Sequence, residues 1–229
     1  MTANVITLLE QIKELDIFES HPLYFVGGTA LAYHLGHRIS EDIDIISAAP
    51  LPHHQITNTI MALGGTKLKD ANALALRLAG LFPDEYMLKF NLHGIKLEFF
   101  AASTPLQKEI VKTASPQPYQ KGKLQIIDLP SIAKLKLIAL LNRKKSRDLF
   151  DFKTVLEENT LTKEQILDTA SKSIKKIDSF LSFCDFIEKM QVAEDDEIVY
   201  LDEKDPKPLN WDEIHKEVLS LLSSKMKYD

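Results

Sequence analysis

The sequence has little of several features that would point to particular classes of protein. Cys184 is the only cysteine, which excludes an internal disulfide and a cysteine-based zinc site and fits the reducing cytoplasm. No stretch approaches the roughly 20 consecutive apolar residues that a membrane-spanning helix needs. The amino-terminal residues lack the basic start and the small-residue cleavage site of a signal peptide. We therefore expect a cytoplasmic protein that does not bind a membrane.

An excess of positive charge is also missing. The 229 residues carry a formal net charge of −5, which argues against indiscriminate binding of nucleic acid. A local basic surface is still compatible with this total, because phosphate contacts depend on where the charges lie. The hydrophobic fraction of 45% is ordinary for a globular fold, and the length allows one large domain or two modest ones.

The stretch between residues 24 and 46 combines a glycine turn with a pair of carboxylates. A short apolar strand ends at Gly27 and Gly28, and the backbone N–H groups at the start of the helix expected next suit a phosphate. A second strand then carries Asp42 and Asp44, which point to the same face because side chains alternate along a strand. Two neighbouring carboxylates repel each other unless a divalent cation lies between them or water screens both. The combination suggests chemistry on a nucleoside triphosphate.

A later part of the chain predicts a β-hairpin that contains one acid. Residues 86–92 and 95–100 are apolar stretches on either side of a His-Gly pair that suits a tight turn. Residues 72–81 fit either a strand or a short buried helix, and we favour a strand. Glu98 lies within the second, otherwise apolar arm of the hairpin. Two interpretations are open: a solvated residue on an open face of the sheet, or a third carboxylate that strand pairing brings beside the two aspartates.

A long helix is expected over residues 131–152. Three of its basic residues fall within one narrow sector of a helical wheel, together with Leu140, and Asp148 and Asp151 continue that sector. These three are Lys136, Arg143 and Arg147. One interpretation is a solvated basic face that pairs with its own aspartates. The other is a set of cations that neutralise phosphate charge, as Arg and Lys clamps do in phosphoryl transfer.

Together these motifs resemble those of the polymerase-beta-like nucleotidyltransferase superfamily. The first part of the resemblance is the order GG-T, then R-x-S-x-D-x-D, then an acid in a later strand. The second part, K-x-x-A-x-x-x-R-x-x-x-R-D-x-x-D, is similar to the pattern of the AbiEii-type nucleotidyltransferase toxins of bacterial toxin–antitoxin and phage-defence systems. The residues that carry the resemblance are Gly27, Gly28, Thr29, Arg38, Ser40, Asp42, Asp44, Glu98, Lys136, Ala139, Arg143, Arg147, Asp148 and Asp151.

The resemblance implies an α+β fold in two parts. A polymerase-beta-like nucleotidyltransferase domain, a mixed sheet flanked by helices, would cover residues 1–128. A C-terminal helical bundle would cover residues 129–229 and contribute Lys136 and its neighbours to the site.

The resemblance also implies a role for each site residue. Asp42, Asp44 and Glu98 would bind Mg²⁺, as two ions about 4 Å apart that activate the attacking hydroxyl and stabilise the departing pyrophosphate. Asp148 would orient the phosphate-binding cations or the acceptor. The nucleotide would be held by Gly27, Gly28, Thr29, Arg38, Ser40, Lys136, Arg143 and Arg147.

The expected function is a Mg²⁺-dependent transfer of a nucleoside monophosphate from an NTP to a macromolecular acceptor. We favour tRNA as this acceptor, and a cognate antitoxin is the expected protein partner. One alternative is a small-molecule adenylyltransferase of the antibiotic-resistance kind, which shares the glycine turn and the aspartate pair. Another is a nucleotide-binding regulatory module that has lost catalysis. The pattern over residues 136–151 argues against the first, and the presence of all three carboxylates argues against the second.

Overall fold

The chain forms two compact units. The computed structural model describes residues 1–69, 73–196, 199–201 and 208–226. Unit 1 comprises residues 1–34 and 40–128, and unit 2 comprises residues 35–39 and 129–229. The short connector 35–39 therefore packs with the carboxy-terminal helices, although it lies early in the sequence.

Unit 1 is built on a mixed sheet. Its described residues form seven strands in the order β3-β4-β5-β2-β1-β7-β6. Strand β2 runs parallel to β5 and β1 runs parallel to β7, while the other neighbouring strands are antiparallel. The strands are β1 (Tyr24–Val26), β2 (Ile43–Ser47), β3 (Thr66–Lys67), β4 (Met87–Leu92), β5 (Ile95–Ala101), β6 (Gln117–Pro118) and β7 (Gln125–Ile126).

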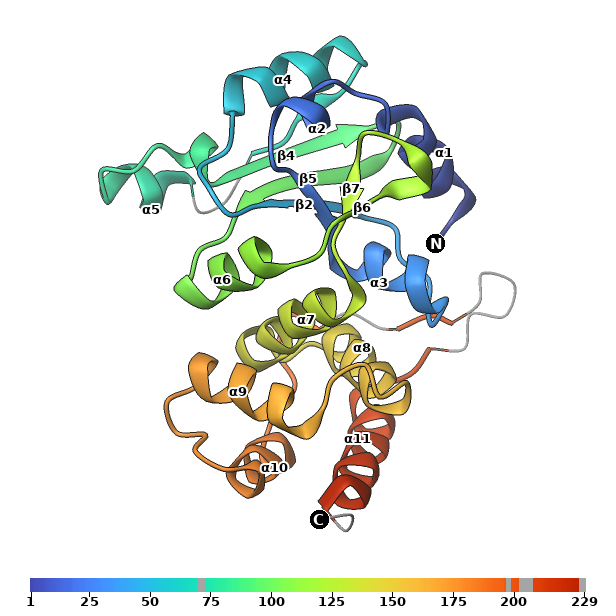
Figure 1. Ribbon diagram of the computed structural model, residues 1–229, viewed down its shortest axis with the longest axis vertical. Coiled ribbons are helices and arrows are strands. Elements are labelled where there is room, and N and C mark those ends of the chain that lie inside the picture. Colours follow the sequence, from blue (N-terminus) through green and yellow to red (C-terminus); the bar gives the residue numbers. More distant parts are fainter. Residues whose placement is uncertain (70–72, 197–198, 202–207, 227–229) are drawn as a thin grey trace. The chain divides into compact units, whose positions relative to one another are not determined.

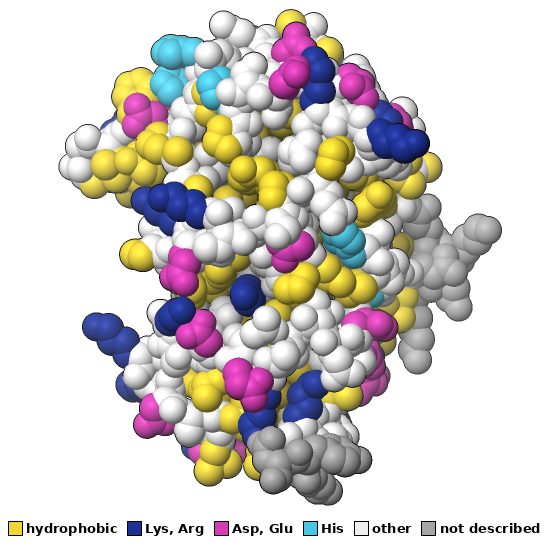
Figure 2. All heavy atoms as spheres, viewed as in Figure 1, with side chains coloured by type: hydrophobic (Ala, Val, Ile, Leu, Met, Phe, Trp, Pro, Cys, Tyr) yellow, Lys and Arg dark blue, Asp and Glu magenta, His cyan; other side chains and the backbone are white. Residues whose placement is uncertain are grey.

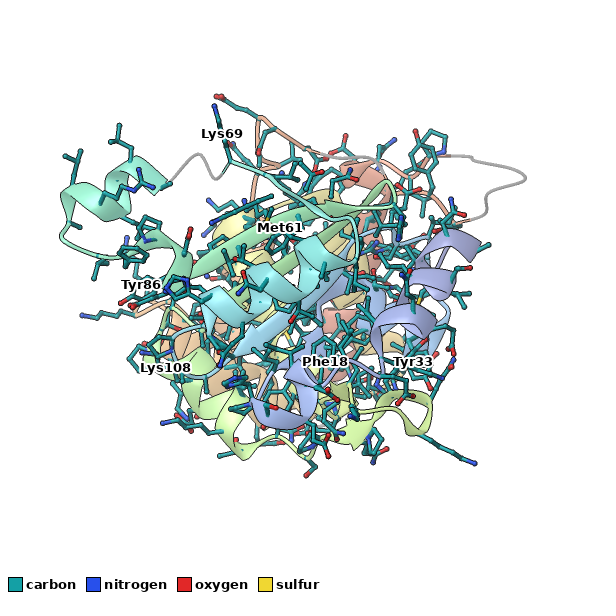
Figure 3. All side chains as sticks on the ribbon, turned by 90° about the horizontal axis from the view of Figure 1, so that it is seen from above. Phe18, Tyr33, Met61, Lys69, Tyr86 and Lys108 are labelled. Atoms are coloured by element: carbon teal, nitrogen blue, oxygen red, sulfur yellow. The ribbon has the colours of Figure 1, made fainter. Side chains whose placement is uncertain are left out.

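Helices cover both faces of this sheet. In Figure 1, α2 and α4 lie over one face, and α3 and α6 lie under the other. Figure 3 looks down on the first face and shows α4, with Met61, lying across the strands. The helices of unit 1 are α1 (Ala3–Ile12), α2 (Ile17–Ser20), α3 (Gly27–Leu35), α4 (His53–Ala62), α5 (Ala73–Leu78) and α6 (Pro105–Thr113), with short 3-10 turns η1 (Pro83–Glu85) and η2 (Tyr119–Lys121).

Strand alternation decides which side chains enter the core of unit 1. Ile43 and Ile45 of β2 are completely buried, as are Leu97 and Phe99 of β5. The residues between them point to the opposite face of the sheet, because successive side chains of a strand alternate. The predicted hairpin is confirmed as β4 and β5, and the predicted mixed α+β fold is confirmed with it.

The strand expected over residues 72–81 is wrong. Residues 73–78 form the short helix α5, none of whose side chains is buried, and residue 72 lies outside the described residues. Leu74 is 68% exposed and Leu78 is 81% exposed. Hydrophobic side chains accordingly gather over α5 on the left of Figure 2. Leucines at every second position suggested a strand, but periodicity reports structure only where one face is packed against a core.

Unit 2 is helical apart from one isolated bridge between Val199 and Leu209 in its described part. Helix α11 packs against α8, and α7 packs against α8 and α9 (Figure 1). Apolar side chains from all of these helices share one core, which includes Phe152, Phe183 and Trp211. The helices are α7 (Leu129–Arg143), α8 (Ser146–Glu157), α9 (Lys163–Ser173), α10 (Phe180–Glu188) and α11 (Trp211–Met226).

The single helix predicted over residues 131–152 is two helices. Lys144 adopts a left-handed backbone with φ of 55°, which ends α7. Ser146 then starts α8, where its backbone N–H and its hydroxyl both donate to the carboxylate of Asp196, at 2.7 and 2.6 Å. Arg147 therefore does not continue the face of α7 that carries Lys136. Because Asp196 lies 50 residues further along the chain, the local sequence pattern could not reveal this break.

Candidate active site

The glycine turn of unit 1 lies directly against one of the two aspartates. Strand β1 ends at Val26, and Gly27 has a left-handed φ of 80°. A Cβ atom at Gly27 would lie 2.0 Å from Oδ2 of Asp44, so the carboxylate fills the space that any other residue would need. Gly28 and Thr29 follow in the first turn of α3, whose backbone N–H groups have no earlier helical partner.

Replacing Gly27 with alanine should destabilise unit 1 by about 1–3 kcal/mol and displace Asp44, because the methyl group meets both a strained φ and the carboxylate. Thermal unfolding followed by circular dichroism measures the loss. Gly64→Ala is the matched control, since Gly64 has a φ of 87° and open space around its Cβ position. Equal destabilisation by the two variants would show that contact with Asp44 is not what requires glycine at position 27.

Two buried hydroxyls join the start of α3 to the start of β2. The hydroxyls of Thr29 and Ser40 lie 2.8 Å apart, and Thr29 also donates to the backbone carbonyl of Asp42. Thr29 has only one hydroxyl proton, so Ser40 is the donor between the two side chains. Both side chains are buried. Their hydroxyls therefore have partners within the protein and fix the backbone from which Asp42 projects.

Strand pairing places the acid of the hairpin beside the second aspartate. In the parallel ladder between β2 and β5, Asp44 is the direct partner of Glu98. In the antiparallel ladder on its other side, Asp44 pairs with Val26, the residue before the glycine turn. Paired residues of neighbouring strands point to the same face. Asp44 and Glu98 are thus adjacent carboxylates on one face of the sheet.

Lys96 connects this pair to Asp42. Its Nζ lies 3.0 Å from Oε2 of Glu98 and 3.3 Å from Oδ2 of Asp42. Lys89 contacts the other oxygen of Glu98 at 3.5 Å. Burial alone would lower the pKa of Lys96, but the carboxylates of Glu98 and Asp42 outweigh it and raise this pKa, so the side chain carries its charge at neutral pH. No sequence motif predicts a role for Lys96, although its position two residues before Glu98 places both on the same face of β5.

The donor atoms of this acidic face fit a divalent cation. Carboxylate oxygens are the ligands that Mg²⁺ prefers, and Asp42, Asp44 and Glu98 supply them. The described residues hold no group of three acidic, histidine or cysteine side chains already gathered as a metal cluster. The ammonium group of Lys96 instead contacts Asp42 and Glu98. The carboxylates of Asp42, Asp44 and Glu98 supply oxygen donors of the kind that suits Mg²⁺.

Unit 2 contains a second group of candidate residues, which surrounds the completely buried carboxylate of Asp151. Arg38 donates from Nε to Oδ1 at 2.6 Å and from a terminal nitrogen to Oδ2 at 3.0 Å. Lys136 lies 2.8 Å from Oδ2, and Nε2 of His37 lies 2.7 Å from Oδ1. Burial opposes ionisation of Asp151, but the charges of Arg38 and Lys136 outweigh it and hold its pKa well below the ordinary value.

A second buried carboxylate extends the cluster. Asp148 accepts two hydrogen bonds from Arg143, at 3.0 and 2.8 Å, and its Oδ1 lies 3.5 Å from Nζ of Lys136. Lys136 is only 6% exposed. Lys136 and Arg143 do pair with their own aspartates; Lys136 and both aspartates are buried, whereas Arg143 is 47% exposed. Arg147, at the start of α8, lies outside this network. A hydrogen bond from Lys145 is the main cause that lowers the pKa of Asp195, and the charge of Arg147 lowers it further.

Two members of this network carried no assignment in the sequence analysis. His37 precedes Arg38, and its ring stacks on Phe150 with centroids 5.9 Å apart and planes 8° apart. Asp151 closes the second sequence pattern but had no role of its own. The local signals were that His37 is adjacent to the candidate Arg38 and that Asp151 follows the candidate Asp148 by three positions.

The helices of the described residues include none that is both long and apolar enough to cross a membrane.

Comparison with known proteins agrees with the fold and the motifs. The family described as "Nucleotidyl transferase AbiEii toxin, Type IV TA system" matches residues 11–224. The uncharacterized protein aq_aa25 of Aquifex aeolicus (strain VF5) is 26% identical over 172 residues, which is 74% of either chain.

Two solved structures resemble the whole fold. JHP933 from Helicobacter pylori has a TM-score of 0.51 and 17% identity, with 99% of this chain and 94% of that chain covered. MenT4, a nucleotidyltransferase toxin from Mycobacterium tuberculosis H37Rv, has a TM-score of 0.52 and 13% identity, with 90% of this chain and 76% of that chain covered. These likenesses concern the fold, whereas the family match spans nearly the whole chain. The predicted family is thereby confirmed: the chain belongs to the AbiEii nucleotidyltransferase toxin family.

Proposed function

We propose that this protein is a Mg²⁺-dependent toxin that transfers a nucleoside monophosphate from an NTP to tRNA in the cytoplasm, as part of a toxin–antitoxin or phage-defence system. The observation that carries the proposal is the pairing of Asp44 with Glu98 on the sheet face that adjoins the glycine turn. Such a face offers hard oxygen ligands for a metal next to N–H groups for a phosphate.

Each residue of unit 1 then has a part in binding. Asp42, Asp44 and Glu98 hold Mg²⁺, which supplies charge stabilisation at the phosphate oxygens when it is bound. The N–H groups of Gly27 and Gly28 hold the triphosphate, because the first N–H groups of a helix have no helical partner and lie at its positive end. Thr29 and Ser40 act as positioning residues, since their hydroxyls fix the backbone at Asp42.

The cations of unit 2 are proposed to bind nucleotide phosphates. Lys136 and Arg38 are held by buried carboxylates, which limits the rotamers that they sample and favours oriented contacts over diffuse attraction. Arg143 is 47% exposed, and its two hydrogen bonds to Asp148 orient its guanidinium group. Arg147 lies outside this network, near Asp195, and is proposed to contact the nucleotide from there.

The choice of acceptor rests on membership of the family and not on a measured surface. The basic face that was expected along one helix is largely internal, because Lys136 is buried and the helix breaks before Arg147. A cognate antitoxin is the proposed protein partner, also because the chain belongs to this family.

Radiolabel transfer tests the proposal. The purified full chain is incubated with Mg²⁺, total tRNA and each of the four α-³²P-labelled NTPs in turn. Label should appear on RNA with at least one NTP, and it should be absent with EDTA or with Asp42→Ala. Induced expression should stop growth for the wild type only. Absence of label on any RNA or protein, or equal label with Asp42→Ala, would contradict the enzymatic function. Label that appears only on an added aminoglycoside would show that the acceptor is a small molecule and not tRNA.

A further inference from the structure

The acidic face of unit 1 contains a cation that belongs to the protein itself. Lys96 contacts two of the three carboxylates to which the proposed function gives a metal, at 3.0 Å from Glu98 and 3.3 Å from Asp42. Glu98 lies on β5, whereas Asp42 lies directly before the first residue of β2. An ammonium group shared by two carboxylates resembles, in charge and in donors, the arrangement that a bound metal would have.

The surroundings of Lys96 indicate that it is able to leave. Its side chain is 39% exposed, and that of Asp42 is 35% exposed. Ion pairs with this exposure are weak, because water competes for both partners. Glu98, at 16% exposure, keeps a second contact with Lys89 and so remains partly neutralised when Lys96 moves. The acids are fixed by the sheet and by Thr29, whereas the lysine is long and flexible.

We propose that Lys96 is a built-in competitor for the metal site and becomes a phosphate ligand once the metal arrives with a triphosphate. This inference rests on the proposed function, because it takes Asp42 and Glu98 as metal ligands. A metal ion alone has to displace the ammonium group into solvent. A metal–triphosphate complex brings the negative charge that gives the displaced ammonium a new partner. Lys96 therefore makes metal binding and triphosphate binding depend on each other, as two linked equilibria.

Titrations with Mn²⁺ test this coupling in the full chain. Free Mn²⁺ is followed by electron paramagnetic resonance in the wild type, Lys96→Met and Lys67→Met. Lys67→Met is the matched control, because it removes a lysine of the same sheet that is paired with Asp84. Lys96→Met should bind Mn²⁺ about 10-fold more tightly than the wild type, whereas Lys67→Met should match the wild type. Lys96→Gln serves as a second variant and should behave like Lys96→Met.

A second arm uses inorganic tripolyphosphate, which avoids any dependence on the base. In saturating Mg²⁺, Lys96→Met should bind tripolyphosphate about 10-fold more weakly than the wild type. Opposite changes for Mn²⁺ alone and for tripolyphosphate, without either change in Lys67→Met, support the proposal.

Two contrary outcomes distinguish the role of Lys96 from the location of the metal site. Equal or weaker Mn²⁺ binding by Lys96→Met, with binding that is lost in Asp44→Asn, would overturn the role of Lys96 and leave the metal site in place. Mn²⁺ binding that Asp44→Asn does not change would overturn both, because the metal would then lie elsewhere.

Discussion

Replacing Asp151 with asparagine should lower the free energy of unfolding of unit 2 by about 3–5 kcal/mol. The carboxylate is completely buried and faces Arg38, Lys136 and His37 at hydrogen-bonding distance. An amide keeps the shape but loses the charge, so two buried cations are left without their main counter-ion. Removing one partner of a buried ion pair costs more than the pair contributes, because the remaining charge stays desolvated.

The single tryptophan makes this prediction measurable for unit 2 alone. Trp211 lies in the core of that unit and is 8% exposed, so its fluorescence in denaturant follows the unfolding of these helices. Asp168→Asn is the control: Asp168 forms an exposed pair with Lys172 at 2.9 Å, and its loss should cost less than about 1 kcal/mol. A similarly small cost for Asp151→Asn would mean that the network contributes little to the stability of unit 2.

The same variant should change how unit 2 responds to acid. The pKa of Asp151 is depressed well below its ordinary value of 3.8 in the folded protein. A carboxylate with a depressed pKa stabilises the fold fully above its unfolded pKa, and this contribution disappears as the pH falls toward the folded pKa. The Trp211 transition of the wild type should therefore lose stability below about pH 4, and part of this loss should be missing in Asp151→Asn.

Local patterns were sufficient for the elements that carry the acids of unit 1. Alternation along β2 predicted the face of Asp44, although the strand begins at Ile43 and leaves Asp42 just before it, and the His-Gly turn predicted the β4–β5 hairpin. The position of Glu98 depended on more than local pattern, because an open face and a paired carboxylate were both compatible with the sequence. The parallel ladder between β2 and β5 decides between them, and such a crossover joins residues that are 54 positions apart in the case of Asp44 and Glu98.

Long-range contacts explain why the network of unit 2 was not predictable. Arg38 donates to Asp151, which lies 113 residues later in the sequence, so their spacing gives no sign of the contact. The break between α7 and α8 likewise depends on Asp196, which satisfies the first N–H of α8 from 50 residues away. A helical wheel assumes one continuous helix, so it placed Arg147 on the same face as Lys136, although α7 ends at Arg143. The motif contains Lys136, Arg143, Asp148 and Asp151, but their partners in the network follow from tertiary packing.

Replacing Asp44 with asparagine should lower nucleotide transfer by about 100-fold or more while leaving the protein as stable or slightly more stable. The amide removes one of the proposed metal-binding carboxylates, and losing one group that stabilises charge in the transition state typically costs this factor. Stability should move the other way, because Asp44 and Glu98 are direct neighbours in the sheet and like charges in that position repel. The gain should be a few tenths of a kcal/mol up to about 1 kcal/mol, since Lys96 and Lys89 already offset part of the charge on Glu98.

Transfer is measured with the labelled NTP that the wild type uses, and stability by hydrogen exchange of the β2 and β5 amides, which reports local opening. Asp84→Asn is the control, because it neutralises another aspartate of unit 1, one that pairs with Lys67. It should leave transfer unchanged. Opposite signs for activity and stability in Asp44→Asn would separate a functional carboxylate from a structural one. A fall in both would mean that Asp44 acts as a hydrogen-bond acceptor that holds the glycine turn, and the loss of transfer would then follow from distortion of Gly27 and not from a missing metal ligand.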